Sequence, residues 1–378
     1  MLSFLKNLIK PKYETLNFIE IKAANLLANF NFLQSCQPQA EIFPILKSNA
    51  YGHGLKEVCL ILNKSKAKMI AVDSYPEAQI AYRYFKGKVL ILGEMPLAVY
   101  KYAKLNRTEF VVYREETLRY LSRYGKRAKI HLFVNSGMNR EGVKHLEKFI
   151  ERNKEYLIKI SVNGFCSHLA SADSDSELNK RQEKNFFTAL DFFEKAGFSP
   201  RYVHLGNSAG VFIFKDKRLT AFRPGLAFYG YSPFLNNKHE IPELKPALEI
   251  FSHLLLIQEI NNQEPVSYNE AYISQQKTQI GLIPFGYFEG LDRRLSNQAN
   301  FEILNKKRTF LAKVAGKVCM NLSCLDLKNN QAEEGDLVRI ITASKNKPNS
   351  LSNLAKISNA GPYESLVRIQ SNIRRRII

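Results

Sequence analysis

Short apolar runs alternate with amphipathic segments between about residues 40 and 230. The apolar runs are rich in strand-forming residues and predict eight strands, at 41–46, 69–73, 88–92, 109–113, 129–134, 158–166, 202–206 and 219–223. Intervening segments such as LKEVCLILNKSK and SELNKRQEKNFFTALDFFEKA have the apolar spacing of helices. Strands that alternate with helices pair in parallel, so this region is expected to form a parallel sheet with helices packed against it.

The eight predicted strands favour a closed (β/α)8 barrel of the TIM type. The alternative, a doubly wound open sheet, lacks the Gly-rich sequence that usually follows its first strand. After about residue 240, strand-like runs follow one another without long helices between them. The expected fold is α/β: a barrel at 16–240, a C-terminal mainly-β domain at 241–378, and an N-terminal segment at 1–15 that packs on the C-terminal domain.

Composition excludes several classes of protein. The chain has 378 residues, of which 45% are hydrophobic, so a sizeable core and more than one domain are expected. No apolar run approaches the roughly 18 residues that span a membrane, and lysines interrupt the N-terminal stretch where a signal peptide would lie. The five cysteines form no CxxC pair, which favours a cytoplasmic protein over a disulfide framework or a zinc site, and no metal is expected.

The formal net charge of +20 raises the question of a nucleic-acid partner. Lysines and arginines are scattered along the whole sequence, however, and only NIRRRII at the end forms a compact basic cluster. No nucleic-acid-binding motif accompanies it, so a solvated basic surface is the favoured interpretation.

Polar and glycine-containing clusters follow five of the predicted strands. Lys47 follows the first, within FPILKSNAYGHG, and NSGMNR, SHLASAD, GNSAG and RPGLAFYG follow the fifth, sixth, seventh and eighth. A single lysine after a strand is usually a solvated side chain. Because a barrel builds its active site at the carboxyl ends of its strands, five clusters there predict a functional site.

These segments resemble the landmarks of the alanine racemases, in the same order. LKSNAYGHG is similar to the pyridoxal-phosphate lysine motif of that family, and the further landmarks are HLFVNSGMNREG, GFCSHLASAD, HLGNSAG, RPGLAFYG, VSYNEAY, IPFGYFEGLDRR and VCMNL. The resemblance covers almost the whole chain, from about Phe18 to PYESLVRI. It implies interconversion of L- and D-alanine with pyridoxal 5′-phosphate as cofactor, D-alanine supply for peptidoglycan, and a homodimer whose active site is shared between subunits.

The resemblance also implies catalytic roles. Lys47 would hold the cofactor as a Schiff base and act as a base on one face of the substrate carbon, and Tyr272 of the other subunit would act on the opposite face. The cofactor serves as electron sink for the carbanion, and both bases need perturbed pKa values at neutral pH. Arg140 would contact the cofactor phenolate and the substrate carboxylate, while Met320 would offer substrate a backbone contact.

The cofactor-binding positions implied by the resemblance are Lys47, Tyr51, Arg140, His168, Asn207, Ser208, Arg223, Gly225, Leu226 and Tyr363. Tyr51, Ser208, Tyr363 and the backbone at Gly225 and Leu226 would hold the phosphate. His168 would lie beside the ring, with Asn207 adjoining. Arg223 would face the ring nitrogen, where its positive charge disfavours a second positive charge.

Three positions depart from the family pattern. Phe133 stands where many members carry a lysine modified by carbon dioxide, Asn321 replaces an aspartate, and Pro224 replaces an apolar residue. Lys129 is a poor substitute for the missing lysine, because four residues of strand separate it from Phe133 by roughly 13 Å. The hypothesis is that a bound anion such as chloride, or the side chain of Asn135, orients Arg140 instead.

Alternatives to an alanine racemase stay open at this point. One is a racemase that acts on serine or on a broader set of amino acids. Another is a non-catalytic pyridoxal-phosphate carrier that shares only the barrel, although such a carrier would need neither the β domain nor Tyr272. A barrel decarboxylase that uses the same cofactor is disfavoured because the matched landmarks follow the racemase pattern.

Overall fold

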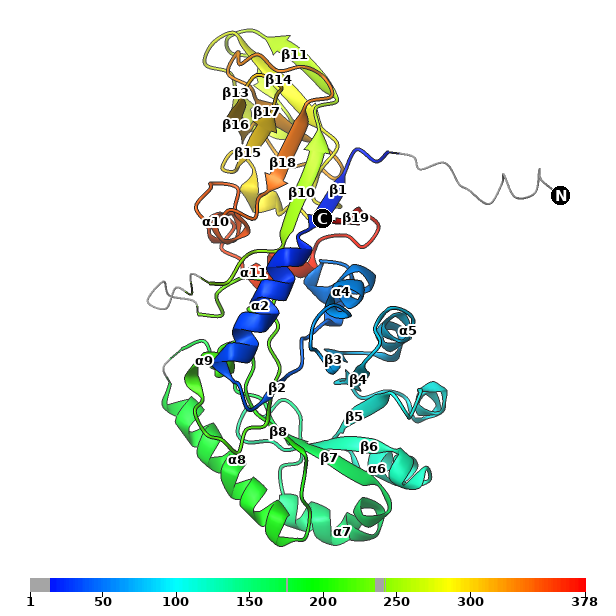
Figure 1. Cartoon of the computed structure of the whole chain (residues 1–378). Helices are drawn as coiled ribbons and strands as arrows, with labels where there is room; N and C mark the ends of the chain where they lie inside the picture. Colours follow the sequence, from blue (N-terminus) through cyan, green and yellow to red (C-terminus); the bar gives the residue numbers. More distant parts are fainter. Residues whose placement is uncertain (1–13, 175, 235–240, 242) are drawn as a thin grey trace, which may run out of the picture. The chain divides into compact units, whose positions relative to one another are not determined.

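The computed structural model describes residues 14–174, 176–234, 241 and 243–378, and its contacts divide the chain into two compact units (Figure 1). The barrel unit comprises 21–248, 362–367 and 377–378, and the β unit comprises the described residues up to Glu20, 249–361 and 368–376. Most of the segment predicted at 1–15 lies outside the described residues. The division differs from the boundaries expected at 16 and 240, because strand β1 (Phe18–Ile21) pairs within the sheet of the β unit.

The barrel unit contains eight short strands: β2 (Glu41–Ile42), β3 (Met69–Val72), β4 (Lys88–Ile91), β5 (Thr108–Val112), β6 (Lys129–Phe133), β7 (Ser161–Cys166), β8 (Tyr202–His204) and β9 (Ala221–Phe222). Strands β3 to β8 pair in parallel, each with the next, and β2 pairs in parallel with β9. An apolar cluster that includes Phe43, Met69, Leu90 and Val111 forms part of the buried core of this unit.

Backbone hydrogen bonds close the ring at its two remaining seams. The N–H of Leu46 donates to the carbonyl of Ala71 over 2.7 Å, which joins the end of β2 to β3. The N–H of Thr220 donates to the carbonyl of Val203 over 3.0 Å, which joins the start of β9 to β8. The predicted (β/α)8 barrel is therefore confirmed.

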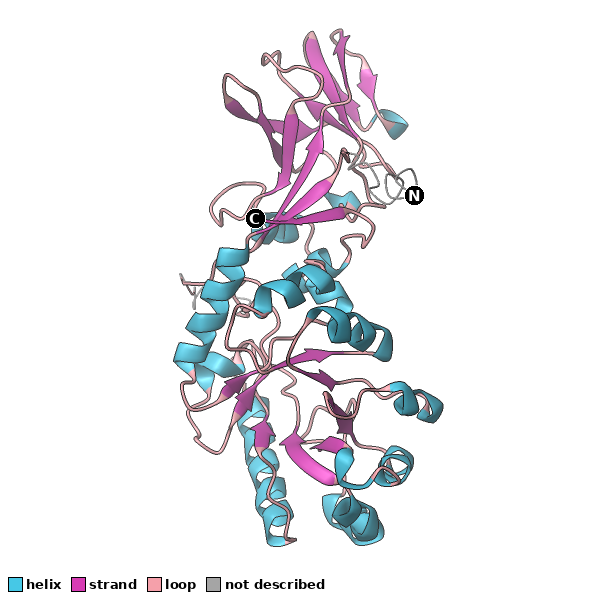
Figure 2. Cartoon of the chain, turned by 45° about the vertical axis from the view of Figure 1, so that its right-hand side comes forward, coloured by secondary structure: helices cyan, strands magenta, loops and turns pink. Residues whose placement is uncertain are grey.

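Helices surround these strands (Figure 2). They are α2 (Ala23–Cys36), α3 (Lys47–Tyr51), α4 (Leu55–Leu62), α5 (Tyr75–Tyr84), α6 (Glu115–Ser122), α7 (Leu146–Lys159), α8 (Glu177–Lys195), α9 (Gly210–Ile213) and α11 (Pro362–Val367), with 3-10 turns η1 (Leu97–Tyr102) and η2 (Gly125–Arg127). Within the described ranges, none of the helices is both long enough and apolar enough to cross a membrane.

The sixth predicted strand, β7, begins later than expected. Residues 158 and 159 end helix α7, and β7 starts only at Ser161. The helix buries Leu146, Phe149, Ile150 and Leu157, so its apolar stripe continues through the segment that the sequence analysis assigned to a strand. Helix α2, ahead of the first barrel strand, is a further element that the sequence analysis does not predict.

The β unit is built almost entirely of strands, as predicted for a mainly-β domain. Nine strands form one sheet in the order β11-β14-β17-β16-β15-β18-β10-β1-β19. Its members besides β1 are β10 (Leu248–His253), β11 (Leu256–Ile260), β14 (Thr278–Ile283), β15 (Asn300–Leu304), β16 (Thr309–Val314), β17 (Ser323–Asp326), β18 (Leu337–Ile341) and β19 (Arg374–Ile377). The remaining elements are the hairpin β12 (Pro265–Val266) and β13 (Tyr272–Ile273), helix α10 (Leu351–Ile357) and turns η4 (Tyr268–Glu270) and η5 (Arg293–Leu295).

One buried amide ties helix α2 to the RPGLAFYG segment and to Lys245. The side-chain nitrogen of Asn29 donates to the carbonyls of Phe228 and Lys245 over 3.1 and 2.8 Å. Its side-chain oxygen accepts the N–H of Lys245 over 2.8 Å. Asn29 and Phe228 are fully buried, so the Phe228 carbonyl has no access to water as a replacement partner.

We expect Asn29→Ala to destabilise the protein by about 2–4 kcal/mol, because it removes three hydrogen bonds and leaves the buried Phe228 carbonyl without a partner. Asn153→Ala is the matched control. That amide is equally buried, but it makes one hydrogen bond, to the carbonyl of Phe149. Loss of this one hydrogen bond should lower the free energy of unfolding by about 1 kcal/mol. Urea unfolding of both variants measures the difference, and equal losses would contradict the anchoring role of Asn29.

Candidate functional site

A pocket of about 420 Å³ lies within the barrel unit, where several strands reach their carboxyl ends. Every site residue predicted for this unit lines it: Lys47, Tyr51, Arg140, His168, Asn207, Ser208, Arg223, Gly225, Leu226 and Tyr363. The two other predicted residues, Tyr272 and Met320, belong to the β unit. The pocket also contains Asp73, Glu141 and His204, which the sequence analysis did not assign to the site.

The backbone after Lys47 forms a left-handed helical turn. Ser48, Asn49, Ala50 and Tyr51 have φ values of 55°, 53°, 53° and 50°. Left-handed backbone costs roughly 1–2 kcal/mol per non-glycine residue, and such strain is typical of functional sites. The turn places Lys47 at its start and Tyr51 at its end, and both side chains line the pocket.

The carboxylate of Glu77 holds this strained turn. Its Oε1 accepts the N–H of Ser48 over 2.6 Å and that of Asn49 over 3.4 Å. Its Oε2 accepts the N–H of Asp73 over 2.8 Å, which fixes the end of β3 to the same side chain. One acidic residue of helix α5 therefore fixes the backbone beneath both Lys47 and Asp73.

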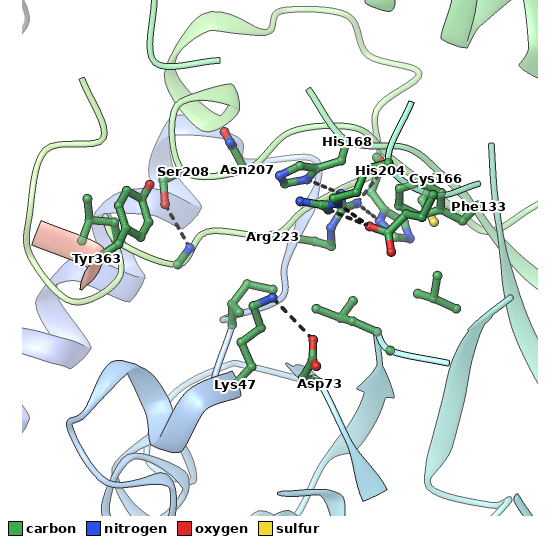
Figure 3. A pocket seen from close by; sticks show the side chains of 18 of the residues that line it. Lys47, Asp73, Phe133, Cys166, His168, His204, Asn207, Ser208, Arg223 and Tyr363 are labelled. Atoms are coloured by element: carbon green, nitrogen blue, oxygen red, sulfur yellow. Dashed lines mark hydrogen bonds and ion pairs between the residues drawn. The ribbon is translucent and has the colours of Figure 1, made fainter. Parts of the chain in front are cut away.

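The Lys47 amine points toward Asp73 (Figure 3). Its Nζ lies 3.4 Å from Asp73 Oδ1, and the two side chains are 41% and 53% exposed. An ion pair as exposed as this contributes little to stability, so the contact leaves the amine available to a ligand. Asp73 is the last residue of the second predicted strand, a position at which the strand-end argument could have found it.

Arg223 is a buried cation at the floor of the pocket, with 6% of its surface exposed. Its Nη1 donates to His204 Nδ1 and to the His204 carbonyl, the latter over 2.9 Å. Its Nη2 donates to the Ser167 carbonyl over 2.6 Å and lies 3.5 Å from His168 Nδ1 (Figure 3). The remaining donor, Nε–H, has no hydrogen-bond partner among the described residues.

His168 is neutral at physiological pH. Burial lowers its pKa to about 3, and the positive charges of Arg223, Arg140 and Lys47 act in the same direction. A neutral ring is able to accept a hydrogen bond from Arg223, whereas an imidazolium would repel it. Burial, reinforced by the cations that line the pocket, therefore keeps this histidine neutral.

Backbone and hydroxyl groups form a cradle at Ser208. Its Oγ accepts the N–H of Gly225 over 2.9 Å and that of Ala227 over 3.2 Å. The N–H of Leu226, between those two residues, has no hydrogen-bond partner in the described part of the chain. Gly225 is required here because a Cβ at this position would lie 2.6 Å from the Tyr51 hydroxyl oxygen.

Two tyrosines complete the cradle. The rings of Tyr51 and Tyr363 lie with their centroids 6.0 Å apart. Burial raises the pKa of Tyr51 well above its usual value and that of Tyr363 to about 12. Both phenols are therefore protonated at neutral pH and able to donate to an anion, for which Leu226 N–H is a third donor.

Arg140 is oriented by its neighbour in the sequence. Its Nε and Nη2 donate to Oε1 of Glu141 over 3.2 and 2.6 Å. Asn135 instead bonds Asn139 through its side-chain nitrogen, and its oxygen accepts the N–H groups of Gly137 and Asn139. The hypothesis that Asn135 orients Arg140 is therefore wrong, because the Asn135 side chain is hydrogen-bonded to Gly137 and Asn139 within its own turn. The anion alternative stays a prediction.

Phe133 ends β6 and lines the pocket as an apolar wall, 9% exposed. Its ring packs edge-on against Tyr113, with centroids 6.2 Å apart. A phenylalanine here has no polar atom to offer Arg140, so Glu141 is the carboxylate that supplies a partner. The sequence analysis missed Glu141 because an acid beside an arginine on a polar loop looks like an ordinary surface residue.

In the β unit, the Tyr272 hydroxyl donates to Asp326 Oδ2 over 3.0 Å. Burial and this hydrogen bond raise the pKa of Tyr272 to about 12, which keeps it a neutral phenol. Met320 is 56% exposed, and its carbonyl accepts the N–H of Phe288 over 2.9 Å. Asn321 donates through its side chain to Glu289 over 3.1 Å.

Solved structures share this two-domain barrel architecture. The alanine racemase of Streptomyces lavendulae is 24% identical with a TM-score of 0.88, covering 97% of this chain and 98% of its own. The alanine racemase of Bacillus anthracis with bound L-Ala-P is 25% identical with a TM-score of 0.87, covering 97% and 96%. A Bartonella henselae alanine racemase with covalently bound pyridoxal phosphate is 21% identical with a TM-score of 0.83, covering 97% and 100%. The fold and the pocket thus define a two-domain barrel enzyme.

The sequence comparisons identify the family. The family models described as alanine racemase, N-terminal domain, and alanine racemase, C-terminal domain, match residues 21–233 and 247–377. An alanine racemase of Helicobacter pylori is 30% identical over 373 residues, 95% of this chain and 98% of its own, and one of Borreliella burgdorferi is 29% identical over 374 residues, covering 95% and 96%. The chain belongs to the alanine racemase family. It is an isomerase, and its reaction class is the racemisation of alanine.

We expect His168 to show no titration between pH 5 and 8.5, because its pKa lies near 3. As the pH falls, this histidine binds a proton at a higher pH in the unfolded chain, where its pKa is near 6.5, than in the folded protein. His168 therefore favours unfolding as the pH falls from about 6.5 toward 3. NMR of 15N-labelled histidines, assigned with His168→Gln, measures the titration. A midpoint between pH 5.5 and 7 would contradict the neutral ring.

Proposed function

We propose that the chain interconverts L- and D-alanine with pyridoxal 5′-phosphate as cofactor, by a two-base mechanism that uses Lys47 and Tyr272. The observation that carries the proposal is the set of groups around one pocket that are available to a ligand. These are the Lys47 amine, the Arg223 Nε–H, the Leu226 N–H and the two tyrosine hydroxyls. They match, group for group, the aldehyde, ring nitrogen and phosphate of this cofactor.

The residues that line the pocket fit the chemistry of the cofactor. Lys47 would bind the aldehyde carbon covalently, and the cradle at Ser208 would hold the phosphate through Leu226 N–H, Tyr51 and Tyr363. Arg223 would donate its Nε–H to the ring nitrogen, with its four other N–H bonds directed to the protein. When bound, pyridoxal phosphate supplies an electron sink that stabilises the carbanion left by loss of the α-proton.

Arg140 would bind the substrate carboxylate. Glu141 engages its Nε and one Nη2 hydrogen, which leaves the Nη1 hydrogens for a second carboxylate. The Lys47 amine, once free of the cofactor, would take or return the α-proton on one face of the substrate carbon. A lysine amine accepts a proton only while it is neutral.

Tyr272 would serve the opposite face of the substrate carbon. The hydrogen bond to Asp326 holds its proton on the phenol oxygen, which is the form that delivers a proton to a carbanion. To act as a base in the reverse direction, the hydroxyl must exchange Asp326 for a partner that favours the phenolate. The two directions of racemisation therefore place opposite demands on this residue.

The shared active site implies a homodimer, which an exposed apolar surface on the β unit supports. Tyr287 and Phe288 are held beside Cys319 and Met320 by backbone hydrogen bonds, and 43% and 47% of their surfaces are exposed, as is 40% of Leu322. Such a surface is typical of a protein interface. We further propose a cytoplasmic enzyme that supplies D-alanine for peptidoglycan, in keeping with five free cysteines.

Incubation with L-alanine in deuterium oxide tests the two-base mechanism. Wild type should exchange the α-proton and form D-alanine, with L-serine as the competing substrate. Tyr272→Phe should lower the racemisation rate at least about 10²-fold, the usual contribution of a general acid or base, and Lys47→Ala should abolish it. Tyr268→Phe, an exposed tyrosine of the same segment, is the control. Undiminished D-alanine formation by Tyr272→Phe would sink the two-base mechanism.

Glu141→Gln tests the orientation of Arg140. We expect KM for alanine to rise about two- to fivefold with kcat little changed, because a partly exposed ion pair contributes roughly 0.2–1 kcal/mol. Glu116→Gln removes a similar exposed pair, with Arg114, outside the pocket and should leave KM unchanged. A lower KM in Glu141→Gln would mean that Glu141 competes with the substrate carboxylate, which contradicts the orienting role.

A further inference from the structure

A line of hydrogen bonds crosses the barrel interior from Arg223 to Glu109. Arg223 Nη1 contacts His204 Nδ1, and His204 Nε2 lies 2.6 Å from His131 Nδ1. His131 Nε2 lies 2.9 Å from Glu109 Oε2. Glu109, His131 and His204 have no exposed surface. We refer to these three residues, on strands β5, β6 and β8, as the buried relay.

The chemistry of arginine fixes the direction of every bond in the buried relay. A guanidinium has donors only, so His204 Nδ1 must be the acceptor and its proton must be on Nε2. That proton is donated to His131 Nδ1, which places the proton of His131 on Nε2, where it faces Glu109. An extra proton on either ring would set two donors against each other. Both imidazoles are therefore neutral Nε2–H tautomers.

Glu109 is the anionic end of the buried relay. Its Oε1 accepts from Lys88 Nζ over 2.9 Å, and its Oε2 also accepts from the Asn163 side chain over 2.9 Å. Burial acts to raise the pKa of this carboxyl, but the hydrogen bonds from His131, Asn163 and Lys88 outweigh this and hold the pKa below its usual value. A buried carboxylate and a buried guanidinium are thus connected through two neutral rings.

Fold stability alone does not account for this arrangement. Each buried charge carries a desolvation penalty of several kcal/mol, and apolar residues of similar volume are often as stable. The surroundings are apolar, since His131 packs against Tyr202 with ring centroids 5.7 Å apart. Space is reserved for the ring as well: a Cβ at Gly164 would lie 2.3 Å from His131 Nδ1.

We propose that Glu109 and His131 are positioning residues of the active site, which act through His204 to hold the guanidinium of Arg223. With His204 fixed as an acceptor, the Nη1 and Nη2 hydrogens of Arg223 are committed to the protein, and Nε–H alone is directed to a ligand. The inference rests on the proposed role of Arg223 toward the cofactor ring nitrogen. It extends the site from the pocket across the barrel interior to Lys88, whose side chain is 34% exposed.

The tautomers are measured first, on wild-type protein free of cofactor, so that the result does not depend on the proposed function. Long-range 15N–1H correlation spectra of labelled histidines, assigned with His131→Gln and His204→Gln, should show both rings as neutral Nε2–H tautomers at pH 7. A charged ring or an Nδ1–H tautomer at either position overturns the buried relay. A protein that gave the expected spectrum but did not racemise alanine would refute the function and not the relay.

Glu109→Gln then tests the positioning role. We expect kcat for alanine racemisation to fall by about tenfold or more, as for other residues that orient a contact group, with KM for alanine within about twofold. The 15N–1H signals of His204 should also differ between Glu109→Gln and the wild type. Glu302→Gln is the matched control, because Glu302 is equally buried and paired with Arg339 and Lys347 in the β unit. It should alter neither kcat nor the His204 spectrum.

Gly164→Ala is a second variant, which displaces the His131 ring but keeps every side chain of the buried relay. It should reproduce the loss in kcat, and it provides the test if Glu109→Gln does not fold. Folded variants with wild-type kcat and an unchanged His204 spectrum would overturn the proposal. Equal losses in Glu109→Gln and Glu302→Gln would overturn it too, since they would reflect general destabilisation.

Discussion

The pocket depends on one constraint, namely that the buried guanidinium of Arg223 donates hydrogen bonds and accepts none. Every group around it is consequently an acceptor: two backbone carbonyls and the neutral rings of His204 and His168. Burial, together with this positive charge, keeps His168 from binding a proton. Across the pocket, Tyr51 and Tyr363 stay protonated. The site thus offers donors and positive charge to whatever binds, which suits a ligand with several anionic oxygens.

The two units contribute in different ways. In the barrel unit, short parallel strands bring side chains from far apart in the sequence to one rim, which is the property that makes this fold a common support for enzyme sites. In the β unit, Tyr272 is held by Asp326 at the end of β17. Burial and the hydrogen bond to that carboxylate keep Tyr272 a neutral phenol. In the barrel pocket, burial is likewise the main reason that His168, Tyr51 and Tyr363 are neutral.

The strand-end argument found most of the pocket, because polar residues directly after a buried strand are conspicuous in the sequence. It could not find His204 or His131, which lie inside strands that read as continuous β segments. Glu141 could not be distinguished from a surface acid beside Arg140. Helix α2 has no acidic residue in its first turn and no capping side chain, so its sequence lacks the usual signals of a helix start. The left-handed turn after Lys47 could not be predicted from the sequence either, since Ser48 and Ala50 have no preference for positive φ. Tertiary contacts, Glu77 above all, impose that conformation.

The strained turn also limits how far this enzyme could be stabilised by engineering. Glycine at position 50 would relieve roughly 1–2 kcal/mol of folded-state strain, partly offset by the greater entropy of the unfolded chain. The same change would loosen the segment that orients the Lys47 amine. Natural sequences commonly retain such local costs where activity requires a fixed geometry. Thermostabilising substitutions in this chain are therefore better sought away from residues 47–52, because a change that stabilises this segment would also lower activity.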